Sequence, residues 1–389
     1  MLKPSPEIEK RLDTYQTIDV TSADALESEW KRERRSRNML RGAIASVAVL
    51  GVFTSISVDI NANKLIQSES SVGLEFKDDA AEIENSHHAN VFIDGFGKKN
   101  ADILTHNLGE AIGAVTDGQQ WSINFDDAHL RPNDIAQLII ETAHERGVDS
   151  VTLVGHSAGG NIAIQTLVNI LQESDIAVPL IYFDLSPYGV EGLQDVQRQN
   201  LGALEWITRH VPDVEYSTPA RVIGEFALRL EVNNSKTPVE NVKNITETAT
   251  GAISRISNGS LPGGWLMLDQ VRAITDTDIE DEFDTIAAMP KNVSRPTIVY
   301  LSTVKPGYDP VVDVDKSSEK IRIAAEEADL SFLSYDIAGA LHSQLDAARA
   351  EYLAVLSDAK DPILDSIDQQ IALAEHYNKI YDRPGPLLR

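Results

Sequence analysis

Ser157 stands among glycines, directly after a run of apolar residues. Residues 151–160 read VTLVGHSAGG, which is a G-x-S-x-G pattern at the end of a predicted strand and the start of a predicted helix. Gly155 and Gly159 indicate a tight turn, because side chains at these positions would collide with the neighbouring strand and helix. The turn lifts the hydroxyl above the sheet and aims a helix N-terminus at it, which favours a developing oxyanion. These residue types predict a nucleophilic serine.

A serine nucleophile needs a base, and the base needs a carboxylate to orient it. Asp309 comes just after the predicted strand RPTIVYLSTV, and His342 follows the next predicted strand, LSFLSYDI. Ser157, Asp309 and His342 thus each follow a strand, in that order along the chain. Asp184, in IYFDLSP, also follows a strand and is the alternative acid.

These segments resemble the α/β-hydrolase family. The G-x-S-x-G turn is the first of them. GYDPVV, residues 307–312, is similar to the family's G-x-x-D-x-V segment, with Gly307 one position closer to the acid. GALH, residues 339–342, is similar to its G-x-x-H segment. The resemblance covers about residues 89–360, apart from an insertion.

The resemblance implies a role for each site residue. Ser157 would be the nucleophile, His342 the base and Asp309 the acid. The main-chain N–H groups of Phe96 and Ala158 would bind the oxyanion. The first of these donors lies in IDGFG, residues 93–97, where Asp94 stands in the place that the family often gives to histidine.

Strands alternate with helices from about residue 89, which indicates a mostly parallel sheet covered on both faces. The alternation breaks over residues 190–294, which have helical patterns and no clear strand run. We therefore predict an α/β class protein with the α/β-hydrolase fold, a mostly parallel central sheet with helices on both faces. A largely helical cap is inserted between the fourth and fifth of these strands.

The N-terminal region predicts a membrane anchor. Residues 31–41 carry six basic residues against one acid, and residues 42–58 carry no charge. A span needs about 20 apolar residues, and a basic flank marks the cytoplasmic side. The predicted parts are a cytoplasmic tail at 1–38, a single-pass transmembrane anchor at 39–59, a linker at 60–86 and an extracytoplasmic hydrolase domain at 87–389. A cleaved secretory signal, which would release the protein, and a buried core helix are the competing interpretations.

Composition excludes several classes of function. The net charge of −26 argues against nucleic-acid binding, which needs Lys and Arg to neutralise phosphates. The chain has no cysteine, which excludes disulfides, thiolate catalysis and Cys-ligated metals. It has no Walker loop, no HExxH segment and no EF-hand loop, so we expect neither a cofactor nor a metal ion.

The sequence thus predicts a membrane-anchored serine hydrolase that cleaves carboxylic esters through an acyl-enzyme intermediate, as esterases and lipases do. Its partner would be a small-molecule or lipid ester. A thioesterase, an amidase or an acyltransferase would use the same side chains. A non-catalytic surface binding protein with the same fold is the alternative from another class, since a fold does not fix a function.

Overall fold

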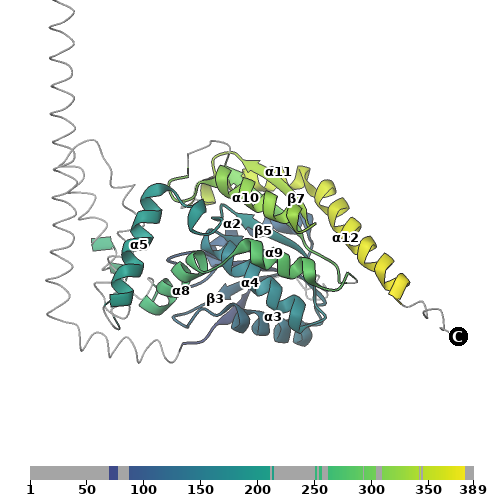
Figure 1. Cartoon of the computed structure of the whole chain (residues 1–389), viewed down its shortest axis with the longest axis horizontal. Helices are drawn as coiled ribbons and strands as arrows, with labels where there is room; N and C mark the ends of the chain where they lie inside the picture. Colours follow the sequence, from purple (N-terminus) through teal and green to yellow (C-terminus); the bar gives the residue numbers. More distant parts are fainter. Residues whose placement is uncertain are drawn as a thin grey trace, which may run out of the picture. The chain divides into compact units, whose positions relative to one another are not determined.

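A computed structural model describes most of the chain from residue 70 onward (Figure 1). The described residues are 70–77, 87–210, 213, 250–251, 254–255, 262–291, 293–303, 309–340, 342 and 345–381. All of them belong to one unit, Ser57–Arg389. The predicted anchor at 39–59 lies outside the described residues. Within those residues, no helix combines the length and the apolar character needed to cross a membrane.

Seven strands form one sheet in the spatial order β1-β3-β2-β4-β5-β6-β7. The strand β1 runs antiparallel to β3, and the other neighbouring pairs are parallel. The carboxyl ends of β2, β4, β5, β6 and β7 therefore lie at one edge of the sheet, where ligand sites of such sheets form. The strands are β1 (Gly73–Phe76), β2 (His88–Ile93), β3 (Gln119–Asn124), β4 (Ser150–His156), β5 (Ala177–Asp184), β6 (Thr297–Thr303) and β7 (Ser331–Ile337).

The central strand β4 shows why an apolar run forms this sheet. Val151 and Leu153 point into the core on one face, and Val154 points into the core on the other. Successive side chains of a strand alternate between faces, and a strand covered on both faces is apolar at almost every position. The continuous run VTLV is the result.

Helices cover both faces of the sheet (Figure 1). One face packs against α3 (Pro132–Arg146), α4 (Ala158–Glu173), α9 (Ile279–Ala288) and α10 (Val314–Glu327). The other packs against α2 (Asp102–Val115), α11 (Arg349–Asp358) and α12 (Lys360–Tyr381). This arrangement is the layered α/β architecture that the alternating sequence pattern predicts.

The predicted cap region is helical in its described part. It contains the short 3-10 helix η2 (Val190–Gly192), α5 (Asp195–His210), α8 (Gly264–Thr275) and α9. Helices α8 and α9 also contribute to the hydrophobic core on one face of the sheet, where Leu266 and Phe283 are fully buried. The Phe283 ring meets the ring of Phe183 on β5 edge to face, at 6.5 Å between centroids. The end of the insertion is thus part of the sheet's covering layer.

Candidate active site

Ser157 lies on a strained turn between β4 and α4. Its backbone has φ 54° and ψ −128°, a conformation that costs about 1–3 kcal/mol for a residue other than glycine. The turn is fixed by two hydrogen bonds. The Ser157 N–H donates to the carbonyl oxygen of Asp184 at 2.9 Å, and the Gly160 N–H donates to the carbonyl oxygen of Ser157 at 3.0 Å. These bonds hold the serine at the carboxyl edge of the sheet, directly before a helix N-terminus.

The flanking glycines allow this close approach of strand and helix. A Cβ on Gly155 would lie 2.5 Å from the Cα of Gly160, and a Cβ on Gly159 would overlap the carbonyl group of Ile93 on β2. Both overlaps involve backbone atoms, which cannot swing aside as the end of a flexible side chain can. The collisions with strand and helix predicted from the sequence are therefore present in the structure.

Gly159→Ala is expected to lower the free energy of unfolding by about 3 kcal/mol or more, because β2 must move to admit the methyl group. Gly202→Ala is the matched control, since no described atom lies within 4 Å of a Cβ at that helical position. Alanine there should stabilise the helix by roughly 0.5–1 kcal/mol. Denaturant unfolding of both variants measures the difference. Equal stability of the two variants would contradict the close approach at Gly159.

His342 lies between Ser157 and Asp309. The Oγ of Ser157 is 2.7 Å from Nε2 of His342, and Oδ2 of Asp309 is 3.0 Å from its Nδ1. Both distances are within hydrogen-bonding range. Asp309 precedes α10 and His342 follows β7, so the shared edge of the parallel strands brings together three residues that are far apart in the sequence.

The surroundings of Asp309 stabilise its ionised form. Its other oxygen, Oδ1, accepts hydrogen bonds from the N–H groups of Val311 and Val312, each at 2.8 Å. Burial by itself would raise the pKa of Asp309, but attraction to His342 and these hydrogen bonds outweigh burial and lower it. Asp309 is therefore ionised at neutral pH and can orient the imidazole of His342.

Asp184, the alternative acid, faces a different histidine. Its Oδ2 lies 2.6 Å from Nδ1 of His156, and its Oδ1 accepts a hydrogen bond from the hydroxyl of Tyr352 at 2.7 Å. The geometry thus favours Asp309 as the partner of His342. Sequence reasoning missed this pair, for which the only sequence signal is that each residue stands at or directly after the end of a predicted strand.

The segment that carries Phe96 lies against the serine turn. A Cβ on Gly95 would lie 2.8 Å from the Cβ of Ser157 and 3.0 Å from the nitrogen of Ala158. Ala158 is the first residue of α4, and the first N–H groups of a helix have no partner within the helix. Phe96 directly follows Gly95 in the sequence and is half-buried. The structure therefore brings both segments predicted to bind an oxyanion to one place.

The carboxyl group of Asp94 is turned back on its own loop. It is buried, and its Oδ1 accepts a hydrogen bond from the Gly95 N–H at 2.7 Å. Burial raises its pKa, against the attraction of His156 and Lys98. The shift favours a neutral carboxyl group, which would repel a nearby oxyanion less than a carboxylate would.

A residue from the cap region supports the same loop. Gln270, on α8, is fully buried. Its Oε1 accepts a hydrogen bond from the Gly97 N–H at 2.9 Å, and its Nε2 donates to the carbonyl oxygen of Lys98 at 2.8 Å. Sequence reasoning missed this contact, since a glutamine within a helical pattern carries no signal of a distant loop. Lys99 forms an ion pair with Asp127 at 2.6 Å, so it anchors the loop as well.

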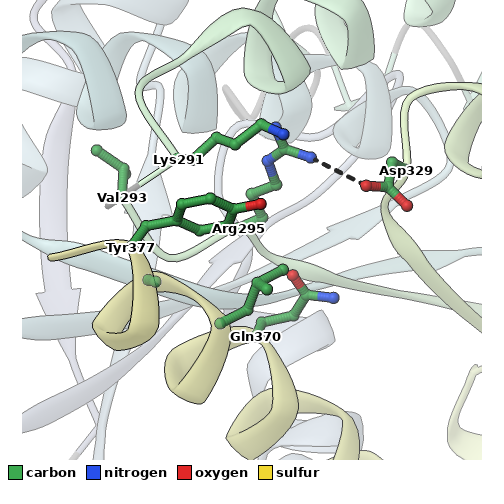
Figure 2. A pocket seen from close by; sticks show the side chains of 8 residues that line it. Lys291, Val293, Arg295, Asp329, Gln370 and Tyr377 are labelled. Carbon is green, nitrogen blue, oxygen red and sulfur yellow. Dashed lines mark ion pairs between the residues drawn. The ribbon is translucent and has the colours of Figure 1, made fainter. Parts of the chain in front are cut away.

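A separate small pocket lies at the opposite edge of the sheet (Figure 2). Arg295 precedes β6 and Asp329 precedes β7, and these two residues form an ion pair at 3.8 Å. The ammonium group of Lys291 lies 5.3 Å from the centre of the Tyr377 ring. The cavity of about 30 Å³ has room for little more than water. Among the described residues, no group of three or more acidic or histidine side chains could hold a metal ion.

No protein-family model matches the sequence, and no curated protein matches it. Solved structures do match. A carboxyl esterase from Bacillus coagulans is 10% identical, with 79% of this chain and 96% of that chain covered and a TM-score of 0.47. A lipase-esterase related protein from Clostridium acetobutylicum is 11% identical, covering 76% and 98%, with a TM-score of 0.41. A membrane phospholipase A is 16% identical, covering 85% and 99%, with a TM-score of 0.43.

Identities and TM-scores of this size say nothing about the reaction of this chain. The sheet itself is the stronger observation. It has seven strands, is parallel apart from β1, and carries helices on both faces. The α/β-hydrolase fold class predicted from the sequence is therefore confirmed, with the cap described only in part.

Proposed function

We propose that this chain is a serine hydrolase that cleaves carboxylic esters. The observation that carries the proposal is the position of the His342 imidazole, 2.7 Å from the hydroxyl of Ser157 and 3.0 Å from the carboxylate of Asp309. A serine hydroxyl is a weak nucleophile without a base, and this geometry supplies the base together with the group that orients it.

The first half of the reaction forms an acyl-enzyme. The Oγ of Ser157 attacks the ester carbonyl carbon while Nε2 of His342 takes its proton. Asp309 accepts the Nδ1–H hydrogen bond and stabilises the imidazolium. The negative oxygen of the tetrahedral intermediate is bound by the N–H groups of Phe96 and Ala158. His342 then donates its proton to the leaving alcohol, and the carbon–oxygen bond of the ester breaks.

The second half releases the acid. Water enters, and His342 takes a proton from it as it attacks the acyl carbon. The same N–H groups bind the second tetrahedral intermediate. Its collapse expels Ser157, which recovers its proton from His342. If an alcohol entered in place of water, the same steps would transfer the acyl group, so the test below includes both acceptors.

We also propose that residues 39–59 anchor the chain, with the N-terminus cytoplasmic and the hydrolase domain outside. The support comes from the sequence, where a basic cluster flanks an uncharged run. The substrate would then be an extracytoplasmic small-molecule or lipid ester. If the segment is instead a cleaved signal, the protein would be secreted.

The test uses the full-length chain, extracted with detergent if it sediments with membranes. We expect turnover of p-nitrophenyl esters, with a preferred acyl length, and labelling by a fluorophosphonate on the peptide that contains Ser157. Stepwise labelling should remove turnover in proportion to the label. An excess of glycerol in the assay would reveal acyl transfer as a glycerol ester.

Two outcomes would contradict the proposed ester hydrolase, and a third would contradict the anchor. Absence of both turnover and label would leave the non-catalytic binding protein as the better hypothesis. Label on Ser157 with turnover of thioesters or amides alone would retain the nucleophile and overturn the substrate class. Recovery of the full-length chain in the soluble fraction, with its N-terminus intact, would overturn the anchor.

A further inference from the structure

His156 and Asp184 form a second histidine–aspartate pair, beside the pair of His342 and Asp309. His156 is the last residue of β4 and precedes Ser157, and Asp184 is its register partner at the end of β5. The Nδ1 of His156 lies 2.6 Å from Oδ2 of Asp184. The side chain of His156 is 6% exposed and that of Asp184 is 0% exposed. A buried pair of this kind, next to the proposed nucleophile, is not used by the reaction described above.

The other nitrogen of His156 reaches the loop that carries His342. Its Nε2 lies 3.2 Å from the main-chain carbonyl oxygen of His342. A carbonyl oxygen only accepts hydrogen bonds, and a carboxylate oxygen accepts them as well, so the two partners suit a ring with hydrogen on both nitrogens. The geometry between Asp184 and His342 therefore favours an imidazolium at His156.

The electrostatic surroundings support the charged ring. Burial would lower the pKa of His156, but the hydrogen bond and the attraction of Asp184 outweigh it and raise the pKa to about 9. The groups that face His156 are Asp184 on β5, Asp94 after β2 and His342 after β7. The rings of His156 and His342 are 5.1 Å apart between centroids.

Asp184 also holds the helix that follows the His342 loop. Its Oδ1 accepts a hydrogen bond from the hydroxyl of Tyr352, which is fully buried on α11. The ends of β4 and β5 thus hold His342 through its carbonyl oxygen and Tyr352 through its hydroxyl.

We propose that His156 is a positioning residue, an imidazolium that binds the backbone of His342 and keeps its ring in reach of Ser157. This inference rests on the proposed hydrolase function. Its physical basis is that the imidazole must be placed within about 1 Å, since a displacement of that size lowers rates by about 10²-fold. Asp184 and Tyr352 support the same loop through His156 and α11.

The first variant is His156→Gln, which can still donate a hydrogen bond from its amide but cannot be an imidazolium. We expect kcat for an ester to fall about 10- to 100-fold, with KM within about threefold of the wild type. A residue that only fills space would leave kcat unchanged once the protein is folded, so circular dichroism and a thermal melt accompany the kinetics.

The pH profile gives a readout that a purely structural role would not move. As pH rises through about 9, His156 loses its proton and one of its two hydrogen bonds. We expect kcat of the wild type to fall reversibly with a midpoint near pH 9, and this limb to be absent from His156→Gln. The free energy of unfolding changes with pH in the same direction. Because the pKa of His156 is raised on folding, its protonation stabilises the fold fully below the unfolded-state pKa of 6.5, and this contribution is lost as pH rises through about 9.

A second pair of variants keeps the inference testable if His156→Gln does not fold. Tyr352→Phe removes one hydroxyl and leaves the His156–Asp184 ion pair in place. It should lower kcat less than His156→Gln and retain the limb near pH 9. Replacing both His156 and Asp184 by Leu leaves no unpaired buried charge, and should lower kcat without the alkaline limb.

The failures are distinguishable. A wild type without ester turnover or probe labelling would overturn the proposed function. A wild type that turns over esters, with kcat and the alkaline limb both unchanged in His156→Gln, would overturn only the positioning role.

Discussion

Ser157→Ala is expected to lower kcat for p-nitrophenyl esters by about 10⁵- to 10⁶-fold, the loss found when a serine hydrolase is deprived of its nucleophile. Alanine keeps the Cβ and removes only the hydroxyl oxygen. The strained backbone of the turn and the N–H group of Ala158 remain. KM and the unfolding free energy should therefore change little, and the variant should no longer react with a fluorophosphonate.

Ser122→Ala is the control for this measurement. Ser122 is also buried, but it lies on β3 and donates its hydrogen bond to Asp102. We expect its kcat to stay close to that of the wild type. Turnover by Ser157→Ala at more than about one thousandth of the wild-type rate, in protein free of contaminating esterase, would mean that another group performs the attack.

Asp309→Asn is expected to lower kcat by about 10⁴-fold. An asparagine amide that donates to Nδ1 of His342 favours the tautomer with hydrogen on Nε2. That tautomer cannot accept the proton of Ser157. The shape of the side chain is retained, so the effect should appear in kcat far more than in KM. Stopped-flow or initial-rate kinetics at pH 8 would measure it.

Asp184→Asn is the matched comparison, because it makes the same chemical change in a second buried carboxylate that lies beside a histidine. Asp184 contacts His156 and Tyr352, so we expect a loss of about 10- to 100-fold, well below that at Asp309. A larger loss in Asp184→Asn than in Asp309→Asn would reverse the assignment of the acid.

The strand-following residues were predictable because parallel strands share one carboxyl edge. Ser157, Asp309 and His342 each follow a strand, so a parallel sheet brings them to the same edge. The apolar runs that alternate with helical patterns in the sequence predict that sheet. Asp184 also follows a strand, which is why sequence reasoning kept it as an alternative. The choice between the two acids depends on which side chain each carboxylate faces in three dimensions.

Other contacts could not be predicted, for a physical reason. Gln270 hydrogen-bonds to Gly97 across 173 positions of sequence, and nothing in either segment marks the other. The pairing of His156 with Asp184 depends on the register of β4 against β5, which contains an irregularity between Ser150 and Thr152. Hydrophobic periodicity identifies strands and their faces, but it does not fix which residues of two strands stand side by side.

The two hydrogen bonds that Gln270 forms limit where the cap can be exchanged for the cap of another protein. A cap exchange that cuts at residue 294, where the helical pattern of the sequence ends, would remove α8 and leave the backbone of Gly97 and Lys98 without its partner. It would also strip α9 from the core. The part of the cap that can be exchanged without breaking these contacts ends before Pro262. Helices α8 and α9 must be kept together with the sheet.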